Sequence, residues 1–260
     1  MAGAGVTAME EVAGPQEGTG YLPSPIPLDQ LRHCAEAHQR LLQLVDRIDD
    51  GALRRATLLP AWTVAHLIAH LARNADSHTR MIEAAQAGRI SAQYPGGAEH
   101  RHREIMLGAT QPIEVLRDDL AAAVRRLEHA WDTMHVDTWR TGLGLTASRG
   151  RTTLADLVFF RWREVEIHMV DLGLTDLGGP GWDGLSPAYV DAEWEWTVRG
   201  LPPRVPPEVT LVLAPGGRPS HAAGRGERVV LVDKPSRVTL RWLTGRGGGD
   251  PSWPKLGPWV

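Results

Sequence analysis

The chain has 260 residues, of which 42% are hydrophobic and 23% charged, so it can form one large globular domain or two modest ones. Its formal net charge of −3 excludes a strong overall attraction to nucleic acid or to an anionic membrane. No stretch comes near the roughly 20 apolar residues that cross a bilayer, and the first residues lack a secretory signal. The sequence therefore predicts a cytoplasmic protein that binds neither nucleic acid nor membrane.

The chain has a single cysteine, Cys34. One thiol excludes an internal disulfide, a paired redox motif and a thiolate zinc site. Cys34 lies inside the first helical pattern, where a small buried apolar residue is expected. Any thiol chemistry would therefore need a thiol supplied from outside the chain.

The first half of the chain alternates between helical patterns and connections. Residues 1–27 are rich in Gly, Ala, Pro and Glu and predict a flexible leader. From residue 28 to residue 48 the apolar residues recur with the helical period, which predicts a first helix. A second helix is expected from Thr63, its N-cap, to about Ala87. Residues 89–108 contain a proline and two adjacent glycines and predict a long loop with at most a short helical piece.

Two further helices complete the predicted bundle. The third runs from about Gln111 to Met134. The fourth opens at Thr153, with Asp156 placed for a capping box, and ends at Gly173. Four helices of roughly 18 to 25 residues predict an antiparallel four-helix bundle over residues 28–175.

The hydrophobic pattern of the sequence changes after Gly173. Residues 188–200 predict a short helix, and Val209–Leu213 and Arg228–Val232 predict strands because they are β-branched runs bounded by Gly or Pro. Residues 238–244 fit either a strand or a helix. The predicted fold class is therefore α+β, with an N-terminal four-helix bundle followed by a smaller α+β domain over residues 188–260.

The fourth helix carries Glu164 and His168, which lie on one face one turn apart. They share the stripe that should face the bundle interior, where a carboxylate is costly unless it is paired or bound to a cation. A carboxylate and an imidazole at this spacing can converge on one metal ion. On spacing alone, two other arrangements stay open: a surface Glu–His pair, or a salt bridge from Glu164 to Arg161 or Arg163.

The second helix carries His66 and His70, also four residues apart, and either could be a third ligand. His70 lies in an apolar run, where a histidine is usually a hydrogen-bonded core residue, and His66 lies nearer the helix start. A set of His70, Glu164 and His168 would leave one position open for water or substrate, as in catalytic zinc sites. Glu166 faces another side of its helix and is not expected to bind the metal.

The sequence segments around these residues resemble those of a known family. Residues 59–64 read Leu-Pro-Ala-Trp-Thr-Val, residues 70–75 read His-Leu-Ala-Arg-Asn-Ala, and residues 163–173 read Arg-Glu-Val-Glu-Ile-His-Met-Val-Asp-Leu-Gly. The three segments resemble the mycothiol-dependent maleylpyruvate isomerase family, which belongs to the DinB-like superfamily of metal-binding four-helix bundles. The resemblance covers residues 28–173 and extends more weakly to Trp-Leu-Thr-Gly-Arg at 242–246.

The resemblance implies a site and its cofactors. The family's zinc ligands fall on His70, Glu164 and His168, and its functional arginine falls on Arg246. Zn²⁺ or another divalent metal and mycothiol are the implied cofactors, and the partners are this low-molecular-weight thiol and a small electrophile. In the implied reaction the thiolate adds to the conjugated double bond of maleylpyruvate, the resulting single bond rotates, and elimination gives fumarylpyruvate. Arg246 or an arginine between residues 101 and 103 would stabilise the enolate.

Two alternatives stay open at this point. The same activated thiolate could remain attached to its electrophile, which would make the protein a mycothiol S-transferase in detoxification or natural-product biosynthesis. A DinB-like bundle could also be a non-catalytic metal-binding protein with a stress or regulatory role.

Overall fold

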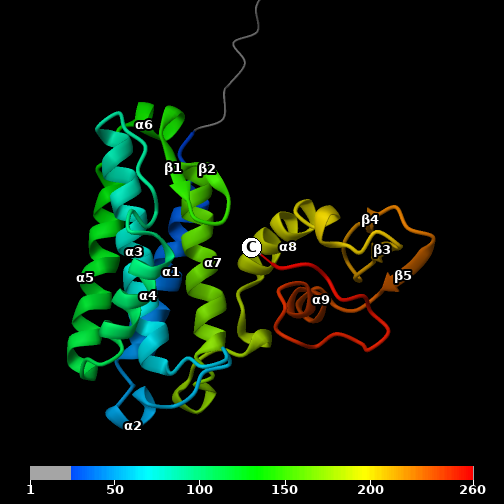
Figure 1. Cartoon of the computed structure of the whole chain (residues 1–260), viewed down its shortest axis with the longest axis horizontal. Helices are drawn as coiled ribbons and strands as arrows, with labels where there is room; N and C mark the ends of the chain where they lie inside the picture. Colours follow the sequence, from blue (N-terminus) through cyan, green and yellow to red (C-terminus); the bar gives the residue numbers. More distant parts are fainter. Residues whose placement is uncertain (1–24, 260) are drawn as a thin grey trace, which may run out of the picture.

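Four long helices form the N-terminal part of the computed structural model, which describes residues 25–259 (Figure 1). Helices α1 and α3 each pack against both α5 and α7, which closes the four into a ring. The helices are α1 (Leu28–Val45), α3 (Val64–Gln86), α5 (Ile113–Asp132) and α7 (Leu154–Asp171). The predicted four-helix bundle is confirmed, whereas residues 1–24 of the predicted leader lie outside the described residues.

Helix α7 is the central element of the molecule. Fourteen of its 18 residues are buried, because the bundle covers one face and helix α8 (Pro187–Arg199) covers the other. Thr153 caps it as predicted, since its Oγ accepts a hydrogen bond from the Asp156 backbone N–H at 3.1 Å. The helix ends before Gly173, which has a φ of 67°.

The connection between α3 and α5 contains more structure than the sequence predicted. Residues 97–108 form a helix, α4 (Gly97–Gly108), that packs along α3. The close approach requires Gly108, because a Cβ there would lie 2.8 Å from the Cβ of Ala69. Only Ile105 of α4 is buried, so the segment lacks the apolar stripe by which a helix is recognised in a sequence.

Three other short elements were not predicted. Two are brief helices, and the third is an antiparallel hairpin whose turn, residues 147–149, reaches the pocket described below. Elements of four to six residues are too short for a hydrophobic period to show. They are α2 (Asp50–Leu53), α6 (Val136–Thr141) and the hairpin strands β1 (Leu143–Thr146) and β2 (Gly150–Thr153).

The C-terminal part contains α8, a three-stranded sheet and helix α9 (Ser236–Leu243). The central strand β3 (Val209–Leu213) pairs antiparallel with β4 (His221–Gly224) and parallel with β5 (Arg228–Val232). The predictions for β3 and β5 are confirmed, β4 was not predicted, and the ambiguous segment 238–244 is helical up to Leu243. Short 3₁₀ turns connect these elements at Thr175–Leu177, Trp182–Gly184 and Pro202–Arg204. The α+β fold class is confirmed, and the domain boundaries stay a prediction.

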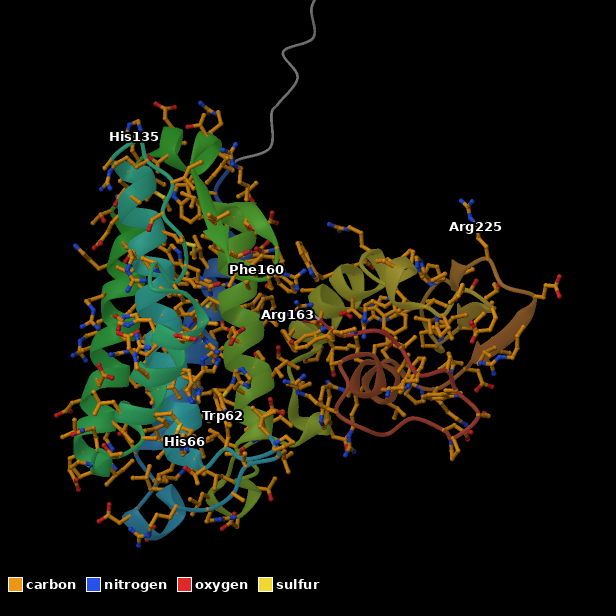
Figure 2. The ribbon with its side chains drawn as sticks, viewed as in Figure 1. Trp62, His66, His135, Phe160, Arg163 and Arg225 are labelled. Atoms are coloured by element: carbon orange, nitrogen blue, oxygen red, sulfur yellow. The ribbon has the colours of Figure 1, made fainter. Side chains whose placement is uncertain are left out.

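A buried ion pair joins the two parts. Arg163 lies on the side of α7 that faces α8 (Figure 2) and donates to Glu193 at 2.6 and 2.8 Å. Tyr189 and Thr197 donate to the same carboxylate at 3.0 and 2.5 Å. Because Arg163, Tyr189 and Thr197 are buried together with Glu193, the ion pair depends on the two parts staying packed together.

Cys34 is fully buried in α1, as its place in the helical pattern predicted. Burial raises the pKa of its thiol well above the ordinary value. Within the described residues, every helix is too short or too polar to cross a membrane. A cytoplasmic location stays a prediction of the sequence.

Candidate metal centre

Helices α3 and α7 bring the three predicted ligands together. The Glu164 carboxylate oxygen Oε2 lies 3.0 Å from His70 Nε2 and 3.2 Å from His168 Nε2. The three potential ligand atoms all lie within 4.8 Å of one another, so they could hold one metal ion. Two imidazoles and a carboxylate are a donor set typical of catalytic zinc sites.

The three side chains shift one another's protonation. Burial lowers the pKa of His70 to about 4, although Glu164 opposes the shift. Burial also acts to raise the pKa of Glu164, but hydrogen bonds from His168 and His70 hold it well below its usual range. For His168, burial is outweighed by Asp171 and Glu164, which raise its pKa. An ionised carboxylate therefore stands between two imidazoles, an arrangement suited to a cation.

Asp171 and Arg246 support His168 from behind. His168 Nδ1 lies 2.9 Å from Asp171 Oδ2, and Arg246 donates to the same carboxylate from Nε at 2.9 Å and from Nη2 at 2.8 Å. This contact holds the ring so that Nε2 faces Glu164. The guanidinium of Arg246 is engaged by Asp171 and lies 4.9 Å from the Trp259 ring. Its predicted catalytic role stays a prediction, and these contacts also allow it to act on His168 through Asp171.

His70 is held from its other side. Arg101 Nη2 of α4 lies 3.1 Å from His70 Nδ1, and the Trp62 ring meets His70 edge-on at 5.5 Å. The turn that presents Trp62 includes Ala61, whose φ of 65° is left-handed and strained for a residue with a Cβ. His66, the other candidate, accepts a hydrogen bond from the Thr63 backbone N–H at 3.3 Å and caps α3.

The alternative partners of Glu164 are engaged elsewhere. Arg163 pairs with Glu193, and Arg161 donates to His38 and Asn74 in the bundle core. Glu166 accepts from Arg40 at 2.6 Å and from the Trp162 indole at 3.0 Å, away from the metal candidates.

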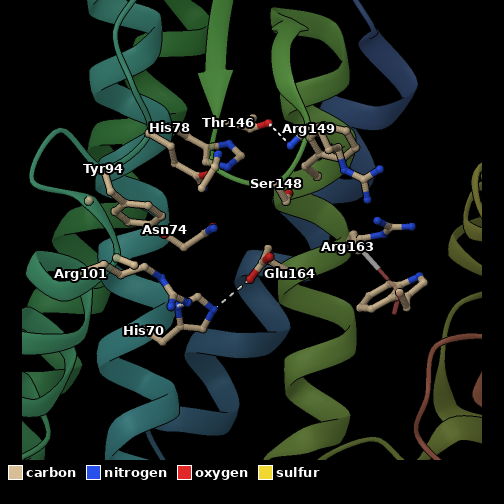
Figure 3. Close-up of a pocket in the computed structure, with 16 residues that line it drawn as sticks. His70, Asn74, His78, Tyr94, Arg101, Thr146, Ser148, Arg149, Arg163 and Glu164 are labelled. Carbon is tan, nitrogen blue, oxygen red and sulfur yellow. Dashed lines mark hydrogen bonds and ion pairs between the residues drawn. The ribbon is translucent and has the colours of Figure 1, made fainter. Parts of the chain in front are cut away.

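A cavity of about 440 Å³ opens beside His70 and Glu164 (Figure 3). Helices α3, α4 and α7, the β1–β2 turn and Trp259 near the C-terminus all contribute to its wall. Its size suits a small organic molecule. Its polar lining includes His70, Asn74, His78, Arg101, Arg149 and Glu164.

Asn74 and His78 were missed as site residues. They follow His70 along α3 at intervals of four residues, and both are buried at the cavity wall. This stripe of three polar residues in an apolar helix was the available signal. The signal lies in the shared spacing of the three residues and not in either histidine alone.

A helical bundle with a partly buried His–Glu–His cluster beside a cavity of small-molecule size is the arrangement of metal-binding bundle proteins. The model of the mycothiol maleylpyruvate isomerase N-terminal domain matches residues 34–173, and the chain belongs to this family. The predicted family is confirmed, and with it the prediction of an enzyme.

Two solved structures resemble the chain over most of its length. One is the mycothiol-dependent maleylpyruvate isomerase, with 25% identity and a TM-score of 0.77. The other is a mutant of the mycothiol-dependent maleylpyruvate isomerase, with 24% identity and a TM-score of 0.79. Each alignment covers 90% of this chain and 97% of the other. None of the curated proteins matches.

Proposed function

We propose that the protein is a zinc-dependent isomerase that uses mycothiol to convert maleylpyruvate into fumarylpyruvate. The observation that carries the proposal is the His70, Glu164 and His168 cluster beside a cavity lined by arginines. Membership of the family and the two similar solved structures support it.

The residues present fit a zinc ion. Two imidazole nitrogens and a carboxylate oxygen converge, and Asp171 holds the far nitrogen of His168 as outer partners of zinc sites do. When bound, the metal would hold the sulfur of mycothiol as a thiolate near neutral pH. The chain has no thiol of its own to offer, because Cys34 is fully buried.

Arginines in the cavity wall suit an anionic substrate. Arg149 lies over the Phe160 ring at 4.6 Å, and burial lowers its pKa to about 10, so it stays cationic at neutral pH. Arg101 approaches from α4 beside His70. Guanidinium groups bind carboxylates with paired hydrogen bonds, and maleylpyruvate carries two carboxylates. Phe160 and Trp259 contribute apolar wall that excludes water from the bound substrate.

Arg101 has a second role at His70. A guanidinium group only donates, so its contact requires Nδ1 to be the acceptor and places the ring proton on Nε2. A metal at Nε2 requires the opposite tautomer. Arg101 therefore competes with the metal for His70, and release of its guanidinium would make its charge available to the substrate.

Three measurements test the proposal in order. Metal analysis of the purified protein should find about one zinc per chain. A cobalt-substituted sample should change its absorption spectrum when mycothiol is added. Maleylpyruvate absorbance should then disappear with catalytic amounts of mycothiol.

The other outcomes separate the alternatives. Stoichiometric consumption of mycothiol would replace the isomerase with an S-transferase. Absence of metal, or an unchanged cobalt spectrum, would overturn the enzyme proposal and favour a binding protein.

A further inference from the structure

A fully buried guanidinium lies behind the cavity. Arg161 of α7 is 0% exposed, and among the described residues no carboxylate oxygen lies within 4.0 Å of it. Its Nε donates to His38 Nε2 at 3.0 Å, and its Nη1 donates to the Leu71 carbonyl at 2.9 Å and to Asn74 Oδ1 at 2.8 Å. Its Nη2 has no hydrogen-bond partner in the described part of the chain. A cation so poorly neutralised raises the positive potential around it.

Arg161 determines which way the Asn74 amide points. Because a guanidinium group only donates, the atom of Asn74 that faces Arg161 must be the carbonyl oxygen. The amide nitrogen is therefore turned away from Arg161, and Figure 3 shows it extending from α3 toward Glu164 and the middle of the pocket. Asn74 is only 2% exposed, and within residues 25–259 its amide nitrogen donates to no acceptor. The amide N–H groups of this cavity-wall residue are therefore available to a ligand in the cavity.

The orientation of Asn74 is held across the bundle. His38 of α1 accepts from Arg161 and contacts Glu128 of α5 through Nδ1 at 2.8 Å. The chain of contacts therefore ties four helices to one amide group. One turn further along α3, His78 lines the same cavity, and its buried Nδ1 has no hydrogen-bond partner in the described residues.

We propose that Asn74, oriented by Arg161, is a catalytic residue that donates its amide N–H to the substrate oxygen on which negative charge develops. This inference rests on the proposed function. For a conjugated double bond to isomerise, a bond from a nucleophile to carbon forms and the π electron pair moves to the conjugated oxygen. After rotation the pair returns and the nucleophile's bond breaks, so no atoms or electrons are gained or lost.

The arrangement suits that transient charge. A donor fixed in advance and aimed at a developing oxyanion contributes roughly 100-fold to 1,000-fold in rate. Arg161, which lies behind the amide, polarises it further without contacting the substrate. The low local dielectric strengthens both the hydrogen bond from Arg161 to Asn74 and the hydrogen bond from Asn74 to the substrate.

The Asn74→Asp variant tests the donor. The substitution keeps the shape of the side chain and an oxygen that faces Arg161. Because the new carboxylate also forms an ion pair with Arg161, the fold should be retained. The turnover number should fall by about 100-fold to 1,000-fold, while zinc content and the cobalt response to mycothiol stay as in the wild type. Gln86→Glu is the matched control, because it makes the same amide-to-acid change on the same helix at an exposed position outside the cavity. Its turnover should stay within about threefold of the wild type, which shows that an added carboxylate on α3 does not by itself explain the loss.

A binding experiment tests Asn74 without any turnover. Asn74 is the only asparagine of the chain, so labelling with nitrogen-15 asparagine gives the signal of a single side-chain amide group, a pair of cross-peaks at one nitrogen frequency, in the NMR spectrum. Titration of the zinc-loaded protein with maleate, a stable cis-dicarboxylate, should shift that signal in a saturable manner. In the Asn74→Asp variant, the affinity for maleate measured by calorimetry should fall at least about tenfold, more than in Gln86→Glu.

The outcomes distinguish this inference from the proposed function. If the wild type binds maleate through Asn74 but does not isomerise maleylpyruvate, the proposed function is wrong and the donor is supported. An unshifted amide signal, or an Asn74→Asp turnover within about threefold of the wild type, would overturn the donor. Loss of zinc from Asn74→Asp would also overturn it, because the residue would then serve the metal.

Discussion

The bundle and the C-terminal part contribute to the site in different ways. All three candidate ligands lie on α3 and α7, where helix geometry spaces them. The C-terminal part supplies Arg246, which reaches His168 only through Asp171, and Trp259, which closes part of the cavity wall. The positions of the ligands therefore depend on the local periodicity of two helices, whereas the residues that support them depend on the packing of the C-terminal part against the bundle.

The largest effect is expected inside the bundle. His70→Ala, Glu164→Ala and His168→Ala should each abolish measurable zinc binding and activity, because even the loss of an outer partner costs roughly 10-fold to 100-fold in metal affinity. Zinc content after dialysis and the affinity for zinc measured by competition check this. Glu166→Gln, on the same helix, should keep its zinc. If Glu166→Gln lost zinc while Glu164→Ala retained it, the ligand assignment would be wrong.

The next effect concerns the junction between the two parts. Glu193→Gln should lower the free energy of unfolding by about 3 to 5 kcal/mol, because it removes one charge of the buried Arg163–Glu193 pair. Urea unfolding measures this difference. The matched control is Glu195→Gln, at an exposed position of α8, which should change stability by less than about 0.5 kcal/mol. Equal stability of the two variants would show that the parts do not depend on this pair.

A smaller effect is expected from the C-terminal part on the metal. Arg246→Met should weaken zinc binding roughly 10-fold to 100-fold, because Asp171 then holds His168 less firmly. Arg246→Lys should lie between this variant and the wild type, since it keeps the charge but loses the paired contact. Arg228→Met, exposed on β5, is the control. Full zinc affinity with lost activity in Arg246→Met would instead place Arg246 on the substrate, as the resemblance first implied.

The smallest effect is a pH dependence within the bundle. Burial lowers the pKa of His38 to about 4, below the roughly 6.5 of an unfolded chain. Its contribution to stability is therefore complete above about pH 6.5 and is lost as the pH falls toward about 4, by up to about 1.4 kcal/mol per pH unit. His38→Gln, which can still bond both neighbours, should show a flatter curve when unfolding of metal-free protein is followed by circular dichroism. An unchanged curve would contradict the buried neutral state of His38, and the exposed His135→Gln is the control.

The sequence predicted those parts of the fold in which a period is long enough to recognise. The four bundle helices and strands β3 and β5 are of this kind. Helix α4 was missed because it buries only Ile105, and β4 because His221–Gly224 has no β-branched residue. In both cases contacts with distant residues, rather than local pattern, determine the structure.

The residues of the candidate site also divide into those that a local pattern predicts and those that contacts between distant residues determine. Helix spacing predicted Glu164 and His168 and left His66 and His70 as candidates for the third ligand, and the resemblance selected His70. The position of Arg246 behind Asp171 depends on a chain reversal that residue spacing does not encode. The orientation of Asn74 depends on a guanidinium contributed by another helix, 87 residues away in the chain.

Cys34 has a consequence for how the protein would respond to oxidative stress. Its sulfur is fully buried and its raised pKa disfavours the thiolate, so it presents no nucleophile for exchange with an oxidised low-molecular-weight thiol. The protein would therefore form no mixed disulfide that inactivates or marks it. With the function proposed above, its activity would rise and fall with the supply of reduced thiol, while the thiol of the polypeptide itself takes no part in redox exchange.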